Sequence, residues 1–188
     1  MDYYENSKNV DQYIQFTPSH DGALLVDLLV THLPAGSTVL EIGMGPGKDF
    51  DKLSKYFAVT GSDFSTTFLE LYRLRNESAD LLHLDARTLV TERTFDAVFS
   101  NKALIHMSDD DLRVSFARQS EVLNAGGLIL HSFWHGTGEA SFGGLPLVYH
   151  DERELTGMLE DAFNIVEIGR HAKMAEGDSI YVLARAKD

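Results

Sequence analysis

The segment that most constrains the fold is residues 39–50, whose sequence is VLEIGMGPGKDF. Its apolar start predicts a buried strand, and Gly43, Gly45 and Gly47 then alternate with other residues before a helical pattern begins. Glycines are needed where the backbone takes unusual dihedral angles and where side chains would strike a ligand. A strand, a glycine turn and a helix in this order therefore predict that a nucleotide-like group lies over the turn.

The remainder of the chain alternates short apolar runs with segments of helical period. After the strand at 37–43 we predict strands at 58–63, 81–84, 95–101, 128–134, 164–169 and 179–186. This alternation is typical of an α/β fold in which helices cover both faces of a parallel sheet. About nine residues separate the last two strands, which is too short for a crossover helix, so we expect that pair to be antiparallel.

Composition limits the class of partner. The chain has 188 residues, the size of one globular domain, so we expect a single domain over residues 1–188. Its 29 acidic and 16 basic residues give a net charge of −13, which argues against binding to nucleic acid and favours a small molecule. The absence of cysteine excludes disulfides, thiolate metal ligands and a cysteine nucleophile.

The first ten residues, MDYYENSKNV, have neither an apolar core nor a basic leader. Apolar runs elsewhere are far shorter than a membrane span. We therefore expect a cytoplasmic protein without a membrane partner. The histidines and carboxylates show no metal-ligand spacing, so we predict no metal.

Two acidic residues narrow the choice of ligand. Position 48 is lysine, so the third glycine of the G-x-G-x-x-G dinucleotide fingerprint is absent. Glu41 lies two residues before Gly43, where a carboxylate suits a cationic ligand such as a sulfonium amino acid and repels a pyrophosphate. Asp63 ends the predicted second strand, where its two oxygens can accept hydrogen bonds from both ribose hydroxyls. Asp63 suits either cofactor, whereas Glu41 and Lys48 favour a sulfonium cofactor over NAD.

With these residues in place, the sequence closely resembles class I S-adenosylmethionine-dependent methyltransferases, from about residue 10 to the C-terminus. The resemblance rests on five motifs in register: LEIGMGPG at 40–47, GSDFS at 61–65, LDA at 84–86, FDAVFSNKALIHM at 95–107 and VLNAGGLILHSF at 122–133. It implies a three-layer αβα sandwich around a seven-stranded, mostly parallel sheet whose last strand is antiparallel. It also implies S-adenosyl-L-methionine as cofactor and S-adenosyl-L-homocysteine as product.

The resemblance places individual residues around that cofactor. The glycine turn would border its methionine and adenosine portions, and Asp63 would hold the ribose. Phe64 would lie against the adenine, residues 85–86 would reach the adenine edge, and Asn101 would face the methionine end. The predicted cofactor-binding residues are Tyr13, Glu41, Gly43, Met44, Gly45, Gly47, Asp63, Phe64, Ser65, Asp85, Ala86 and Asn101.

Two segments are the least similar to the family and are where such enzymes recognise substrates. Residues 1–35 are predicted as a helical lid segment, in which Tyr13 and neighbouring aromatic residues cover the cofactor or pack on the domain surface. Residues 135–150 are rich in glycine and lack helical period, so we predict a substrate-side loop. Trp134 and Tyr149 bracket this loop, where they would line an acceptor pocket or pack against the fold.

Methyl transfer from a sulfonium is an in-line displacement that needs alignment in a dry pocket rather than a metal. A hydroxyl or protonated amine acceptor also needs a base, for which histidine has a suitable pKa. His131 lies within a predicted strand and is expected to be a core residue. The candidate bases are His106 after the predicted fourth strand, His135 after the fifth, and His150 at the end of the predicted loop.

Three functions remain open from the sequence. The first is an S-adenosylmethionine-dependent methyltransferase that acts on oxygen or nitrogen of a small molecule. The second is a non-catalytic S-adenosylmethionine-binding partner or regulatory protein. The third is a protein methyltransferase, since an acidic surface can attract a basic partner. Glu41 and Lys48 disfavour an NAD-linked oxidoreductase, and the sequence leaves open the acceptor and the choice between monomer and homodimer.

Overall fold

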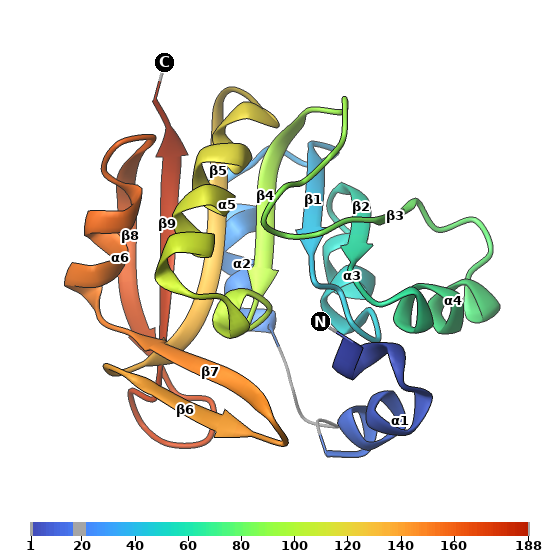
Figure 1. Ribbon diagram of the computed structural model, residues 1–188. Helices are drawn as coiled ribbons and strands as arrows, with labels where there is room; N and C mark the ends of the chain where they lie inside the picture. Colours follow the sequence, from blue (N-terminus) through green and yellow to red (C-terminus); the bar gives the residue numbers. More distant parts are fainter. Residues whose placement is uncertain (1, 17–21, 188) are drawn as a thin grey trace.

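Five parallel strands at the centre of one sheet carry the glycine turn (Figure 1). The computed structural model describes residues 2–16 and 22–187. The strands lie in the order β3-β2-β1-β4-β5. Because the chain order reverses between β1 and β4, the carboxyl ends of these two strands can open a crevice there. The strand bounds are β1 (Thr38–Ile42), β2 (Ala58–Asp63), β3 (Leu81–His83), β4 (Phe95–Asn101) and β5 (Leu123–His135).

The two C-terminal strands complete the central sheet. β9 (Ser179–Ala186) pairs antiparallel with β5 and also with β8 (Phe163–His171), so it lies between them. These seven strands, with β9 antiparallel to its neighbours, match the predicted mostly parallel sheet, and two further strands, described below, extend the sheet to nine strands within the described residues. Residues 172–178 are too few to form a crossover helix between β8 and β9.

Helices cover both faces of the sheet and give the predicted three layers (Figure 1). α5 and α6 pack on one face, whereas α2, α3 and α4 pack on the other. Strand β1 serves both, since Leu40 belongs to the first apolar cluster and Val39 to the second. The helices are α1 (Ser7–Phe16), α2 (Ala23–His32), α3 (Lys48–Leu53), α4 (Thr66–Arg75), α5 (Asp109–Glu121) and α6 (Glu152–Leu159).

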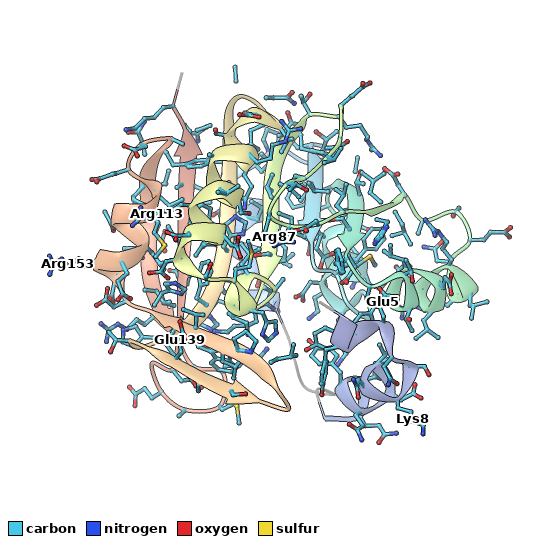
Figure 2. All side chains as sticks on the ribbon, viewed as in Figure 1. Glu5, Lys8, Arg87, Arg113, Glu139 and Arg153 are labelled. Atoms are coloured by element: carbon cyan, nitrogen blue, oxygen red, sulfur yellow. The ribbon has the colours of Figure 1, made fainter. Side chains whose placement is uncertain are left out.

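Charged side chains mark the outer surface of these helices. Arg113 on α5 and Arg153 on α6 are exposed and point away from the sheet (Figure 2). In the part of the chain that the structure describes, no helix combines the length and the apolar character needed to cross a bilayer.

The structure corrects the loop predicted at 135–150, because most of these residues form a β-hairpin. Its strands are β6 (Glu139–Phe142) and β7 (Leu145–His150), which pair antiparallel. Gly143 and Gly144 make the turn with φ of 59° and 87°, and positive φ at both turn residues suits the twist of a tight hairpin. β7 also runs parallel to the end of β5, with Tyr149 opposite Trp134.

The N-terminal segment docks at the carboxyl edge of the sheet, the same edge at which the hairpin lies (Figure 1). It consists of the 3-10 helix η1 (Asp2–Glu5) followed by α1. The Ser65 hydroxyl donates a 2.5 Å hydrogen bond to the Tyr4 carbonyl. The Thr66 backbone N–H and hydroxyl donate to the Glu5 carboxylate at 3.0 and 2.8 Å. These bonds attach the segment to the start of α4.

Candidate functional site

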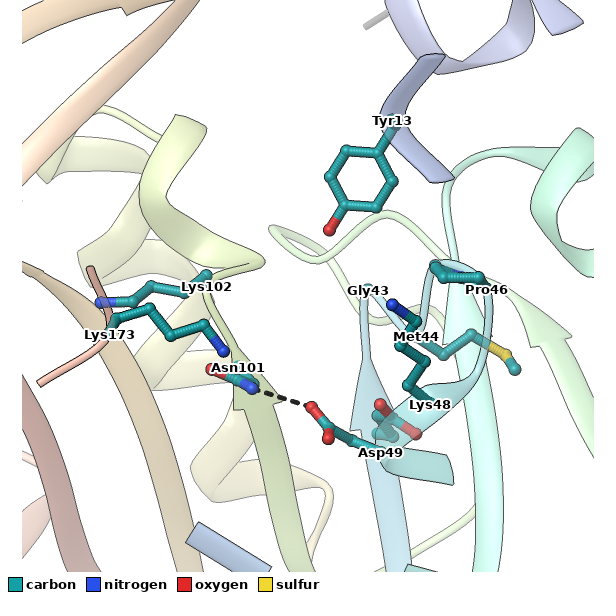
Figure 3. A pocket seen from close by; sticks show the side chains of 11 residues that line it. Tyr13, Gly43, Met44, Pro46, Lys48, Asp49, Asn101, Lys102 and Lys173 are labelled. Atoms are coloured by element: carbon teal, nitrogen blue, oxygen red, sulfur yellow. Dashed lines mark hydrogen bonds between the residues drawn. The ribbon is translucent and has the colours of Figure 1, made fainter. Parts of the chain in front are cut away.

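The carboxyl ends of β1 and β4 border a cleft at the point where the strand order reverses (Figure 3). Its walls come from the glycine turn after β1, from the end of β4 and from α1, which holds Tyr13 above the turn. Of the predicted cofactor-binding residues, Tyr13, Glu41, Gly43, Met44, Gly45 and Asn101 line this cleft. The other lining residues are Pro46, Lys48, Asp49, Lys102 and Lys173.

The glycine turn takes a backbone path that side chains would obstruct. Gly43, Gly45 and Gly47 have φ of 66°, 51° and 79°, a region that favours glycine. A β-carbon on Gly43 would lie 2.4 Å from the β-carbon of Ala103, in the segment after β4. A β-carbon on Gly45 would lie 3.9 Å from the Tyr13 ring. The bare turn therefore lets this segment and the ring approach it closely.

Glu41 is the most unusual charged group at the cleft. Its side chain is 3% exposed, and no hydrogen-bond donor within residues 2–16 and 22–187 reaches its Oε2 atom. Burial raises the pKa of Glu41 well above its ordinary value, and the nearby carboxylates of Asp49 and Asp63 raise it further. A buried carboxyl oxygen without a donor is costly, so this position suits a ligand that brings a donor or a positive charge.

Asp63 is not among the lining residues, and backbone groups of two turns hold it at the end of β2, next to the glycine turn. Its Oδ2 accepts a 2.8 Å hydrogen bond from the Gly45 N–H, and its Oδ1 accepts one of 2.9 Å from the Ser65 N–H. Burial raises the pKa of Asp63, while these backbone N–H groups lower it. Each carboxylate oxygen keeps a second lone pair, so the group retains acceptor capacity for ligand hydroxyls.

Asn101 joins the end of β4 to helix α3 and to the neighbouring strand β5. Its Nδ2 donates a 2.8 Å hydrogen bond to Asp49 at the start of α3, and its Oδ1 accepts one of 2.7 Å from the Ser132 hydroxyl on β5. Asp49 in turn accepts a 3.1 Å bond from the Gly22 N–H, just before α2. The amide is thus fixed in orientation on the wall of the cleft (Figure 3).

Gly47 and Ser65 are engaged by the protein itself and do not line the cleft. Gly47 precedes α3, and a β-carbon on it would lie 2.2 Å from the Tyr72 ring. The Ser65 hydroxyl caps the first turn of α4, and its backbone N–H bonds to Asp63. Both residues shape the turns that hold the lining residues.

Phe64, Asp85 and Ala86 lie beside β3 rather than in the cleft lining. Phe64 is 39% exposed, and its ring centre lies 5.7 Å from that of His83. Asp85 forms a 2.7 Å ion pair with Arg87, whose hydrogen bonds lower the pKa of this carboxyl. The Ala86 carbonyl accepts a 2.7 Å hydrogen bond from a serine of α5. An adenine at this edge would meet the exposed Phe64 ring.

His106 lies in the 3-10 helix η2 (Leu104–His106), which follows β4. Its Nδ1 is 2.7 Å from the Pro146 carbonyl oxygen in the hairpin, so Nδ1 carries the proton and Nε2 is the acceptor. Burial lowers the pKa of His106, and the bond to Pro146 raises it. Its ring centre lies 6.3 Å from that of Tyr4. His106 therefore links the hairpin to the N-terminal segment at the edge of the cleft.

The structure does not bring His135 or His150 to the cleft. They face each other across the β5 and β7 pair. The Nε2 of His135 lies 3.6 Å from Glu152 on α6, and the Nε2 of the buried His150 lies 3.2 Å from Asp109 on α5. His131 is fully buried and bonded to other side chains, which confirms its assignment to the core.

Four charged residues that line the cleft are not among the residues predicted from the sequence to bind the cofactor. Lys48 and Asp49 follow the glycine turn directly, and Lys102 follows Asn101, so proximity to a motif was the available signal for these three. Lys173 belongs to the segment between β8 and β9, where no motif marks it.

Comparisons with known sequences find methyltransferases. Residues 39–127 match a family model described as a methyltransferase domain. Phosphoethanolamine N-methyltransferase 1 of Zea mays is 25% identical in an alignment of 154 residues, and the match covers 74% of this chain and 30% of that protein. The chain thus spans about 30% of the length of this curated relative.

Solved structures share the fold. A 1,6-didemethyltoxoflavin-N1-methyltransferase of Burkholderia thailandensis, with bound 1,6-didemethyltoxoflavin and S-adenosylhomocysteine, superposes with a TM-score of 0.80 at 22% identity and covers 100% of this chain and 84% of its own. An S-adenosylmethionine-dependent methyltransferase of Clostridium acetobutylicum gives a TM-score of 0.77 at 14% identity, over 97% and 99% of the two chains.

Proposed function

We propose that this chain, which belongs to the class I S-adenosylmethionine-dependent methyltransferase family, transfers a methyl group from S-adenosylmethionine to a small molecule and releases S-adenosylhomocysteine. The observation that carries the proposal is Glu41, a buried carboxyl group next to the bare glycine turn, one oxygen of which is reached by no donor among the residues that the structure describes. A cationic, nucleoside-containing ligand satisfies both features, because it brings an ammonium donor and a group that lies flat over glycine.

The residues at the cleft fit this cofactor. Glu41 would accept the amino group of its methionine portion, and the Asp63 carboxylate would accept its ribose hydroxyls. Gly43 and Gly45 leave space over the turn, and Tyr13 covers it from α1. When bound, S-adenosylmethionine supplies an electrophilic methyl group on a sulfonium. The protein then has to exclude water and align an acceptor with that methyl group.

His106 is the base that we propose for a protonated acceptor. Its Nε2 is the acceptor nitrogen, because Nδ1 donates to the Pro146 carbonyl. It follows β4 by a few residues, so it sits on the segment that closes on Gly43. His106 bonds to Pro146 of the hairpin, and its ring lies against Tyr4 of the N-terminal segment. We propose that the hairpin and the N-terminal segment both cover the site.

Nitrogen is the acceptor atom that we favour over oxygen. The relatives support this choice, since the maize enzyme and the Burkholderia enzyme are both named for N-methylation. A further structural neighbour is a glycopeptide N-methyltransferase, so proteins of this fold can also act on acceptors larger than a small molecule. A protonated amine must lose its proton before it can attack, which gives His106 a defined task.

Calorimetric titration with S-adenosylmethionine, S-adenosylhomocysteine and NAD tests the proposal. We expect micromolar binding of the first two ligands, loss of that binding in Asp63→Ala, and no binding of NAD. Asp161→Ala is the control, because it removes an exposed carboxylate that is remote from the cleft. Binding of NAD alone would overturn the proposal. Cofactor binding without methyl transfer to any amine would instead indicate the non-catalytic binding protein.

A further inference from the structure

Two lysines lie on one wall of the cleft of a protein whose net charge is −13 (Figure 3). Lys102 follows β4, and Lys173 comes from the segment between β8 and β9. Both lie across the cleft from the glycine turn, although the Lys102 side chain points away from the turn, whereas Lys48 and Asp49 lie on the side of the turn. The wall opposite the turn therefore carries positive charge.

Lys102 is held in place by unusual geometry. Its φ is 59°, which is strained for a residue with a side chain, and its backbone N–H donates to the carbonyl and hydroxyl of Ser132 at 3.2 Å each. Its Nζ lies 4.1 Å from the centre of the Trp134 ring and donates to the Phe133 carbonyl. The strained turn thus directs this ammonium group toward the end of β5.

No carboxylate forms an ion pair with Lys102 within residues 2–16 and 22–187. Its fixed partners are a carbonyl oxygen and an aromatic face, both of them neutral. Neutral partners orient an ammonium group without forming an ion pair with it, so an anion that enters the cleft would form a charge-assisted bond with it.

From this arrangement we infer that Lys102, stacked on Trp134, binds an anionic group, a carboxylate or a phosphate, of the methyl acceptor. The inference rests on the proposed function and adds the substrate class: a small amine that carries an acid group. The amine would point toward the cofactor side of the cleft, and the acid group would point toward the end of β5.

The direction of the side chain separates this role from binding the carboxylate of the cofactor. Lys102 points away from the glycine turn, and its Nζ lies at Trp134 on β5 (Figure 3). Trp134 is paired with Tyr149 of the hairpin, the segment that the sequence indicates for substrate recognition. The lysine therefore belongs to the acceptor side of Asn101.

The charges around Lys102 support an anionic ligand. Burial lowers the pKa of Lys102 to about 7, Asp178 raises it, and Lys173 lowers it. His171 also faces this cluster: burial lowers its pKa, and Lys102 and Lys173 lower it further. A bound anion would favour the protonated lysine, so anion affinity should fall as the pH rises above 7.

Trp134 is the single tryptophan of the chain, so its fluorescence reports directly on this site. Protein saturated with S-adenosylhomocysteine is titrated with inorganic phosphate and with acetate, at constant ionic strength set by sodium chloride. We expect a saturable change with at least one of the two anions, and the stronger one identifies the acid group. Lys102→Gln should weaken that binding about tenfold or more, and Lys102→Arg should restore part of it.

Lys55→Gln is the matched control, because it removes one positive charge from an exposed position after α3. It should leave anion binding unchanged. Affinity of Lys102→Gln for S-adenosylhomocysteine should stay within about twofold of the wild type, which also shows that the variant is folded. Loss of cofactor affinity by tenfold would place the lysine on the cofactor and overturn the inference.

Three other outcomes also overturn it: equal effects of chloride and of both anions, an anion response that survives in Lys102→Gln, and no response in the wild type. Failure of the wild type to bind S-adenosylhomocysteine would be a different result, because it counts against the proposed function before any anion is added.

Discussion

Gly43 and Ala103 approach so closely that a β-carbon on Gly43 would lie 2.4 Å from the β-carbon of Ala103. The contact joins the turn after β1 to the segment after β4. Gly43→Ala should therefore push the two walls of the cleft apart. We expect a loss of about 1–3 kcal/mol in the free energy of unfolding and a weakening of S-adenosylhomocysteine binding by at least about tenfold, measured by chemical denaturation and calorimetry.

Gly36→Ala separates the contact from backbone strain. Gly36 has φ of 81°, comparable to the 66° of Gly43, but a β-carbon there would have no atom within 4 Å. It should lose stability and keep cofactor affinity. Equal cofactor affinity in both alanine variants would show that the close approach does not matter for the site.

Glu41→Gln should stabilise the protein without its cofactor and weaken cofactor binding. The folded-state pKa of Glu41 lies well above 4.5, so its contribution to stability is full at low pH and is lost as the pH rises toward the folded value. The glutamine variant lacks this loss, and the difference should reach about 1–3 kcal/mol at pH 8. Denaturation at pH 4 and pH 8 measures it.

The same variant should bind S-adenosylhomocysteine about tenfold more weakly, because the ammonium group loses a charged partner. A Glu41→Gln variant that is less stable than the wild type at pH 8 would contradict the prediction that the buried carboxyl group lowers the stability of the protein. A variant with unchanged cofactor affinity would remove Glu41 from the binding site.

His106→Gln should lower kcat by about 100-fold or more, as expected for loss of a general base. The KM for S-adenosylmethionine should not change, because His106 does not line the cleft. Since burial lowers the pKa of His106 below 6.5, the wild-type rate should be flat above pH 6.5 and fall in more acidic buffer. His32→Gln, on α2, is the control. A pH profile that is identical in wild type and His106→Gln would exclude this base.

His131 should make the fold sensitive to acid. Burial lowers its pKa to about 3, so the folded protein binds fewer protons than the unfolded chain between pH 3 and 6.5. Its stabilising contribution is therefore full above pH 6.5 and falls by about 1.4 kcal/mol per pH unit below it. Denaturation curves between pH 4 and pH 8 measure this slope.

His131→Leu should flatten that dependence and lower stability at pH 7. It leaves the Ser100 hydroxyl and the Gln119 amide oxygen without their partner, at a cost of about 1–3 kcal/mol. An unchanged acid slope in this variant would assign the sensitivity to other groups.

The glycine turn and the antiparallel last strand were predictable because each depends on local pattern. An apolar run of strand length ends at Gly43, and the chain between β8 and β9 is too short to cross over, so both features follow from residues near one another in the chain. The place of Glu41 and Asn101 in the lining of the cleft was also predictable, because both lie at or near the ends of strands that border the switch point.

The sequence predicts neither the hairpin nor the wall of the cleft that carries Lys102 and Lys173, for different reasons. The glycine content of residues 135–150 predicts a loop, but Gly143 and Gly144 lie next to each other between short apolar runs, which is also the pattern of a hairpin turn. Lys102 could not be assigned a role from sequence, because its surroundings come from β5 and from the segment before β9, far away in the chain. Contacts of this range are set by tertiary packing.

The place of β9 between β5 and β8 has a consequence for biosynthesis. Because β9 follows both β5 and β8 in the chain, it leaves the ribosome after them and must insert between them, where it bonds to both. Until residues 179–186 have emerged, β5 and β8 present open edges that can pair with other chains. A nascent or truncated chain should therefore be prone to aggregation, and a stalled ribosome would hold a protein with a gap through its core.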